Sequence, residues 1–251
     1  MHKEQELQEI EYDLPYHYIP QIQGGEIISE LSVDWSYEYL TSIETVLKKF
    51  KQFKPNSFLD IGCGDGRLIN EISPNYPKTK FFGYDYSEKA IRYANIYKKS
   101  DNTYFETKNI LNEEQPSREK YDFVTLIEVL EHIPKENAEN FLFECLKLVN
   151  TGGTFMIIVP HTNKKVIKKH YQHFNESILT EIFDRYPKEI KIEEIIFLDK
   201  VSFINSLLRR IVKNRLYVLY PLWKVYQRHN LNLINKSEKN CGRICMIIKV
   251  L

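Results

Sequence analysis

The sequence predicts an α/β protein built on a doubly wound, mostly parallel β-sheet. From residue 57 onward, short apolar segments alternate with amphipathic segments of helical spacing, as in repeated strand–helix units. A glycine-rich turn, "LDIGCGDGRL" at 59–68, separates the first of these strands from the first of these helices. The composition, with 43% hydrophobic and 27% charged residues, is that of a globular protein. Parallel strands need crossover connections, so the alternation favours helices packed on both faces of one sheet.

The elements are expected in the following order. A helix over 34–50 begins the pattern, with Trp35 and Ile43 on one apolar face and Asp34 as its N-cap. The expected strands are 57–62, 80–85, 102–106, 121–128, 154–160, 190–198 and 243–251. The helices between them are expected at 66–73, 88–99, 135–149 and 175–186, and "NTGG" at 150–153 predicts a helix stop and a turn. The last strand follows a helix-rich excursion, so we expect it to enter the seven-stranded sheet antiparallel.

Three regions are expected. Residues 1–50 form an N-terminal extension with a cap helix, residues 51–199 and 237–251 form the core, and 200–236 is a helical insertion. The insertion contains no Asp or Glu and is rich in Lys, Arg, Leu and aromatic residues. A basic amphipathic helix pair of this kind suits an anionic membrane surface, an RNA backbone or a phosphorylated sugar. The other interpretation is a lid that packs its apolar face on the core or on a second subunit.

Bulk properties exclude several classes of protein. The net charge is +1 and the pI is about 7.6, so the chain lacks the overall basic charge of many nucleic-acid-binding proteins. The four cysteines, at 63, 145, 241 and 245, have neither zinc-site nor disulfide-framework spacing, and we expect reduced thiols. The N-terminus has no signal-peptide core, and there is no apolar stretch long enough to span a bilayer. The expected location is the cytoplasm, with peripheral membrane contact through 200–236 as an open alternative.

The glycine-rich turn is the sharpest local signal. It contains three glycines, Gly62, Gly64 and Gly66. They permit a tight turn and a close approach of a ligand to the backbone. Asp85 ends the next strand, where a carboxylate can accept both hydroxyls of a ribose. Asp60 and Asp65 would repel a pyrophosphate in this loop but suit a cationic ligand that carries an ammonium group.

These motifs resemble class I S-adenosylmethionine-dependent methyltransferases. The resemblance rests on "LDIGCGDG", on the acidic end of the second strand and on "NTGGTFMIIVP", and it covers about 57–199 plus the last strand. It implies a Rossmann-like fold and S-adenosyl-L-methionine as cofactor. Asp60 and the glycines would face the methionine part, Asp85 the ribose, and Tyr86, Asn109 and Ile110 the adenine. Asn109 departs from the acidic residue that the family often has there. The alternative for the loop is a structural glycine turn without a ligand.

A second cluster of polar residues follows the strand at 121–128. The stretch "TLIEVLEHIP" places Glu128, Glu131 and His132 at the carboxyl edge of the sheet, where doubly wound sheets bind ligands. Glu128 is therefore expected beside the sulfonium of the cofactor, and all three groups converge if the strand breaks into a helical turn. Further histidines follow the next strand, namely His161, His170 and His173. Carboxylate and imidazole groups together suit Mg²⁺ or Mn²⁺.

The Glu-x-x-Glu-His segment resembles that of small-RNA 3′-terminal ribose 2′-O-methyltransferases. That resemblance implies a divalent metal held by Glu128, Glu131, His132 and a later histidine, for which His170 fits better than His173. In the alternative interpretation, His132 or His170 acts as a metal-free base, or the groups only position the acceptor.

Three functions are consistent with these observations. The first is O-methylation of a hydroxyl on a small molecule, a sugar or a lipid-linked glycan, with Glu128, His132 and His170 as catalytic residues. The second is metal-dependent methylation of an RNA ribose 2′-hydroxyl at a 3′ end. The third is a non-catalytic protein on a methyltransferase fold, against which the intact glycine loop and Asp85 argue.

Overall fold

The computed structural model describes residues 22–23, 26–27, 33–111, 119–187, 189–199, 207, 221 and 237–251. The membrane, RNA and lid interpretations of 200–236 therefore concern a segment that lies almost entirely outside the described residues. The same holds for most of the N-terminal extension before residue 33.

The core is a seven-stranded sheet in the order β5-β4-β3-β6-β7-β9-β8. Its strands are β3 (Ser57–Ile61), β4 (Lys80–Asp85), β5 (Thr103–Thr107), β6 (Tyr121–Ile127), β7 (Val149–Pro160), β8 (Ile190–Leu198) and β9 (Arg243–Val250). The pairings among β3 to β7 are parallel, and β9 lies antiparallel between β7 and β8. The predicted mostly parallel sheet with an antiparallel last strand is confirmed. A separate two-stranded pair joins β1 (Ile22–Gln23) to β2 (Glu26–Ile27).

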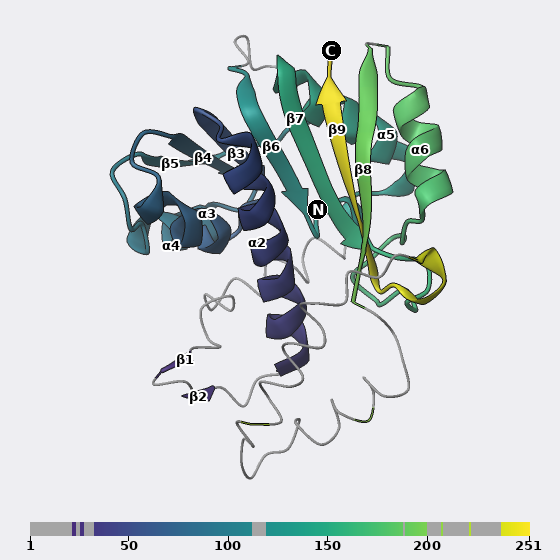
Figure 1. Ribbon diagram of the computed structural model, residues 1–251, viewed down its shortest axis with the longest axis horizontal. Helices are drawn as coiled ribbons and strands as arrows, with labels where there is room; N and C mark the ends of the chain where they lie inside the picture. The colour runs from purple at the N-terminus through teal and green to yellow at the C-terminus, as the bar shows by residue number, and fades with distance from the viewer. Residues whose placement is uncertain are drawn as a thin grey trace.

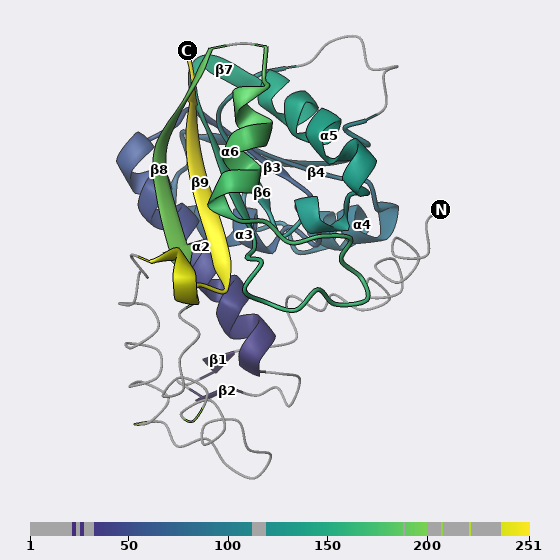
Figure 2. The same ribbon diagram turned by 90° about the vertical axis from the view of Figure 1, so that its right-hand side faces the viewer.

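Helices cover both faces of this sheet. They are α2 (Val33–Phe53), α3 (Arg67–Ile72), α4 (Glu88–Ile96), α5 (Lys135–Lys147) and α6 (Glu176–Asp184). Figures 1 and 2 show α5 and α6 together on one face and α2 across the other. Two buried clusters match these faces, because one contains Phe141 of α5 and Phe183 of α6. The other contains Phe50 of α2 and Ile69 of α3.

Local chemistry explains where several helices begin. The side chain of Ser87 accepts a hydrogen bond from the Ala90 N–H at the start of α4, and Asn175 accepts from Ile178 N–H at the start of α6. Helix α2 already begins at Val33, so Asp34 lies inside its first turn and not at the expected N-cap. Within the described ranges, no helix has both the length and the hydropathy needed to cross a bilayer.

The expected turn at 150–153 belongs instead to an irregular strand. β7 begins at Val149, which pairs with Tyr121, and regular pairing resumes only where Thr154 meets Phe123. Gly152 has a φ of 75° within this irregularity. Helix α5 already ends at Lys147, and the chain uses this left-handed glycine to bulge within a strand that pairs with β6. No disulfide joins any of the four cysteines, all of which are described and buried.

Candidate active site

A cavity of about 440 Å³ opens at the carboxyl edge of the sheet. The chain runs from β3 outward to β4 and β5 and then returns to β6 on the other side of β3, so the strand order reverses between β3 and β6. Ligands bind at this reversal in doubly wound sheets. Most of the predicted site residues line the cavity, namely Asp60, Gly62, Asp85, Tyr86, Asn109, Ile110, Glu128, Glu131, His132 and His170. Gly64 and Gly66 are not among the residues that line it.

The glycine loop owes its shape to left-handed backbone at all three glycines. Gly62, Gly64 and Gly66 have φ values of 72°, 55° and 76°. Asp85 braces the loop, because its Oδ2 accepts a hydrogen bond of 2.9 Å from the Gly64 N–H. Its Oδ1 accepts another, also of 2.9 Å, from the Ser87 N–H. A carboxylate has about four acceptor positions, so Asp85 keeps capacity for further donors while it holds the loop.

Burial controls the protonation of Asp60 at the floor of the same loop. The Asp60 side chain accepts a hydrogen bond of 2.7 Å from the Thr125 hydroxyl. Desolvation raises the pKa of Asp60 to about 7, although the Thr125 hydrogen bond opposes the shift and Asp85 adds to it. A cationic group placed beside Asp60 would favour its ionised form. This end of the cavity therefore suits a ligand that carries an ammonium group.

Gly66 is expected to be intolerant of any side chain. A Cβ there would lie 2.7 Å from Phe105 Cζ and 3.0 Å from Ala94 Cβ, whereas a Cβ at Gly152 would meet no atom of the described residues within 4 Å. Both glycines have a φ near 75°. Gly152→Ala should therefore cost only the backbone strain, about 1–2 kcal/mol. Gly66→Ala should add the cost of overpacking, for a total of about 2–5 kcal/mol.

Urea unfolding of the two variants measures this difference. Equal losses of unfolding free energy would contradict the packing shown around Gly66.

The opposite wall is made by the turn after β6. Glu128 follows directly after β6 with a φ of 55°, an uncommon conformation for a residue with a side chain. A 3₁₀ turn follows at Leu130–His132. The Glu131 carbonyl oxygen accepts a hydrogen bond of 2.8 Å from the Tyr171 N–H, which ties this turn to the loop after β7. The expected break of the strand into a helical turn is thus present.

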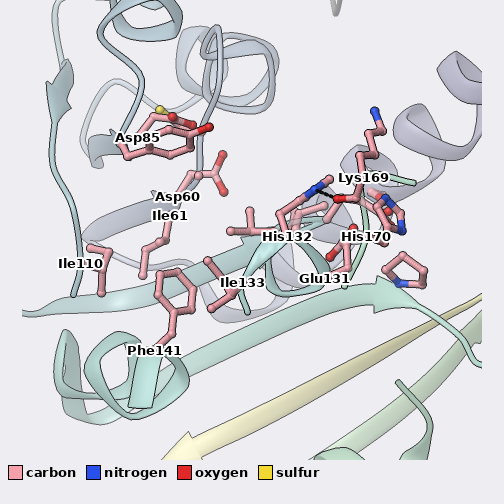
Figure 3. Close-up of a pocket in the computed structure, with 18 of the residues that line it drawn as sticks. Asp60, Ile61, Asp85, Ile110, Glu131, His132, Ile133, Phe141, Lys169 and His170 are labelled. Carbon is pink, nitrogen blue, oxygen red and sulfur yellow. Dashed lines mark hydrogen bonds between the residues drawn. The ribbon is translucent and has the colours of Figure 1, made fainter. Parts of the chain in front are cut away.

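Glu131, His132 and His170 meet in the cavity. One potential ligand atom from each lies within 4.8 Å of the others. Figure 3 shows this group at one end of the cavity and Asp60 with Asp85 at the other. Glu131 is fully buried, and no N–H or hydroxyl group of the described residues donates to its carboxylate oxygens; the neighbouring Glu128 carboxyl group is close enough to share a proton with it. Glu128 is not a member of this set, because one of its oxygens lies 3.5 Å from Arg243 Nη1.

The charges of this cluster follow from its environment. Desolvation, with Glu128 as a second cause, raises the pKa of Glu131 well above its ordinary value. Desolvation also raises the pKa of Glu128, while Arg243 and Lys164 oppose that shift. Burial lowers the pKa of His170 to about 3, with further contributions from His132 and His173. His170 is therefore a neutral imidazole with an available electron pair at neutral pH.

Several cavity residues were missed from the sequence. Arg243 is almost completely buried, forms an ion pair with Asp199 and donates a hydrogen bond to Ser42. Its only sequence signal was a basic residue at the start of an otherwise apolar strand. Lys164 lines the cavity and forms an ion pair of 2.8 Å with Glu38 of α2.

His161, in contrast, does not belong to this site. Its Nε2 lies 3.1 Å from Glu238 Oε1, and it is absent from the cavity wall.

Comparison with known proteins agrees with this geometry. The model of the methyltransferase domain family matches residues 34–191. The chain is 25% identical over 208 residues to a ubiquinone biosynthesis O-methyltransferase of Pelagibacter ubique (strain HTCC1062), a match that covers 78% of this chain and 83% of the relative. It is 31% identical over 109 residues to one from Ralstonia nicotianae (strain ATCC BAA-1114 / GMI1000), a match that covers 43% of this chain. The chain spans about half the length of this second relative (44%) and of the one from Leptothrix cholodnii (strain ATCC 51168 / LMG 8142 / SP-6; 54%).

Solved structures share the fold. The plantazolicin methyltransferase BamL, crystallised with a triazolic desmethylPZN analog and SAH, superposes with a TM-score of 0.57 at 19% identity over 86% of each chain. The methyltransferase domain of bacterial-CtHen1-CN gives a TM-score of 0.56 at 13% identity, covering 84% of this chain and 99% of that domain. Identities this low establish a common architecture and leave the acceptor open.

Proposed function

This chain belongs to the methyltransferase domain family, and from that premise we propose that it transfers a methyl group from S-adenosyl-L-methionine to a hydroxyl oxygen of a small molecule, a sugar or a lipid-linked glycan. The observation that carries the proposal is the continuity of one cavity from the Asp60–Asp85 end to the Glu131–His132–His170 end. The relatives named as O-methyltransferases support an oxygen acceptor.

The residues at the first end would bind the cofactor. Asp85 would accept the ribose hydroxyls, and Tyr86, Asn109 and Ile110 would face the adenine. Asp60 and the glycine loop would hold the methionine part, where the ammonium group favours the ionised form of Asp60. The bound cofactor supplies an electrophilic methyl group on its sulfonium. Alignment of the acceptor oxygen with that methyl group is the main task of the protein in such a displacement.

The residues at the second end would receive the acceptor. His170 is neutral, so its electron pair is available to accept the proton of the acceptor hydroxyl or to bind a metal ion. A pKa of about 3 makes it a weak base on its own, so the metal-ligand role is the better supported of the two. Glu128 lies beside the same wall, where its contact with Arg243 holds the carboxylate toward the cavity. His132 donates from Nδ1 to the Lys169 carbonyl at 2.9 Å, which fixes the orientation of its ring.

The same residues fit a divalent metal, which forms the finer part of the proposal. Glu131 provides two buried carboxylate oxygens, and His132 and His170 provide nitrogen ligands. Carboxylate and imidazole groups are suitable ligands for Mn²⁺, with Mg²⁺ an alternative that usually retains more water. Such an ion would lower the pKa of the acceptor hydroxyl. Glu128 would join the set only by turning away from Arg243.

A thermal-shift titration with S-adenosylhomocysteine tests the proposal, with Mn²⁺, with Mg²⁺ and with a chelator. At 100 times its Kd, the ligand should add about 2.7 kcal/mol to the free energy of unfolding. A further increase with Mn²⁺ supports the metal site. Stabilisation that is the same with ion and with chelator supports a histidine base without metal. Absence of any shift with S-adenosylhomocysteine contradicts the cofactor assignment and favours a non-catalytic role.

RNA is the second candidate acceptor. Lys164, Lys165 and Lys169 line the cavity beside the histidines and could contact phosphate groups. Incubation of a small RNA with the protein and cofactor, followed by periodate, separates the two candidates. Protection of the 3′-terminal ribose from oxidation would assign the acceptor as RNA, and unprotected RNA would leave the smaller hydroxyl compounds.

A further inference from the structure

Two histidines that line the cavity are tied to carbonyl oxygens of one loop. His132 Nδ1 lies 2.9 Å from the Lys169 oxygen. His173 Nδ1 lies 3.0 Å from the Lys164 oxygen, and its Nε2 lies 2.9 Å from His170 Nδ1. His173 thus stands between a backbone carbonyl and one of the candidate catalytic residues.

These contacts determine which ring nitrogen carries each proton. A carbonyl oxygen only accepts hydrogen bonds, so Nδ1 of His173 must be the donor. A neutral imidazole has a single ring proton, so Nε2 of His173 is an acceptor and must receive its hydrogen bond from His170 Nδ1–H. The electron pair of His170 is then left on Nε2. By the same reasoning, the Lys169 carbonyl leaves the electron pair of His132 on its Nε2.

We propose that His173 is a positioning residue that fixes His170 as the Nδ1–H tautomer, so that His170 presents an unprotonated Nε2 to the site it shares with Glu131 and His132. The inference rests on the proposed function, because this electron pair is what would take the acceptor proton or bind a divalent cation. It adds a role for a residue whose side chain is only 8% exposed.

The geometry argues against His173 as a direct member of the site. Among the described residues, the converging ligand set contains Glu131, His132 and His170 but not His173. Both of its ring nitrogens already have partners, in Lys164 and His170. Hydrogen-bond partners of this outer kind orient the ring, fix its tautomer and increase its basicity.

Histidine tautomers can be read directly by long-range ¹H–¹⁵N NMR of the ¹⁵N-histidine-labelled protein in the presence of a chelator. The variants are His173→Phe, which keeps a ring of similar size without an acceptor, and His173→Gln, which keeps an amide oxygen as acceptor. His161→Gln is the control in the same loop. The His161 ring is hydrogen-bonded at both nitrogens and lies outside the cavity, and the substitution keeps the His161 backbone, which contacts His173.

The expected result is an Nδ1–H tautomer for His170 in the wild type, in His173→Gln and in His161→Gln, and its loss in His173→Phe. An Nε2–H form of His170 in the wild type would overturn the proposal, whether or not any variant folds. So would a His173→Phe protein that keeps the Nδ1–H form.

Co²⁺ titration, followed by visible absorption, gives a second readout. The loss of an outer partner of this kind lowers metal affinity by about 10- to 100-fold, so His173→Phe should bind Co²⁺ that much more weakly than the wild type or His173→Gln. Equal Co²⁺ affinities of His173→Phe and the wild type would show that His173 does not help His170 to bind a cation. Absence of Co²⁺ binding in the wild type would contradict the metal part of the proposed function, while the tautomer measurement would still decide the role of His173.

Discussion

Replacement of Asp85 by Ala is expected to weaken cofactor binding strongly. Asp85 accepts the Gly64 and Ser87 N–H groups, so its removal frees the glycine loop and deletes the acceptor for the ribose hydroxyls. Hydrogen bonds to a charged group contribute about 1.5–3 kcal/mol each. The loss of the two hydrogen bonds from the ribose hydroxyls to Asp85 therefore predicts a Kd for S-adenosylhomocysteine that is roughly 10²–10⁴-fold higher.

Calorimetric titration of Asp85→Ala and Asp85→Asn measures this effect. Asn keeps one oxygen acceptor and the size of the side chain, so its loss of affinity should be smaller than that of Ala. Asp122→Asn is a suitable control, because Asp122 also accepts hydrogen bonds from backbone N–H groups. It lies at the N-terminal end of β6, at the edge of the sheet opposite the cavity. An unchanged affinity in Asp85→Ala would remove Asp85 from the cofactor site.

Replacement of Glu131 by Gln is expected to separate activity from stability. Methyl transfer should fall by roughly 10²–10⁴-fold, the range for loss of a group that assists proton transfer from the acceptor hydroxyl. Glu131 would assist that transfer as a ligand of the proposed metal ion. The unfolding free energy near pH 7.5 should rise by about 1–3 kcal/mol, because the substitution removes a buried acidic group whose ionisation is opposed by desolvation and by Glu128. Both measurements are made with a chelator present and then with Mn²⁺ added.

The stability difference between Glu131→Gln and the wild type should depend on pH. The pKa of Glu131 is raised in the folded protein, so the folded state keeps a proton that the unfolded chain releases. The wild type therefore loses stability as the pH rises from the ordinary carboxyl pKa toward the raised one. Glu131→Gln cannot titrate, so its advantage over the wild type should grow with pH across that window.

Glu128→Gln is the matched comparison. Desolvation raises the pKa of Glu128 as well, but Arg243 and Lys164 oppose that shift, so Glu128→Gln should gain less stability than Glu131→Gln near pH 7.5. A Glu131→Gln protein that is less stable than the wild type at every pH would contradict the raised pKa of Glu131.

The order of strands and helices could be predicted from the sequence because it depends on local periodicity. β4 and β8 have the predicted bounds, 80–85 and 190–198, and the antiparallel position of β9 was also anticipated. The cofactor end of the site was predicted for a similar reason. The glycine loop and Asp85 stand at the ends of neighbouring strands, and a strand end fixes which edge of a sheet a residue reaches.

Only the tertiary structure decided the relations between distant segments. The sequence placed Glu128 with Glu131, His132 and His170, but Arg243, far along the chain, draws the Glu128 carboxylate toward itself. The left-handed Gly152 became a bulge because β6 pairs with residues on both sides of it. The proposed tautomer of His170 depends on His173 and on the Lys164 carbonyl oxygen, and no spacing in the sequence encodes those contacts. Periodicity and strand ends are local properties of the chain, whereas charge pairing and tautomers are set by neighbours that only folding brings together.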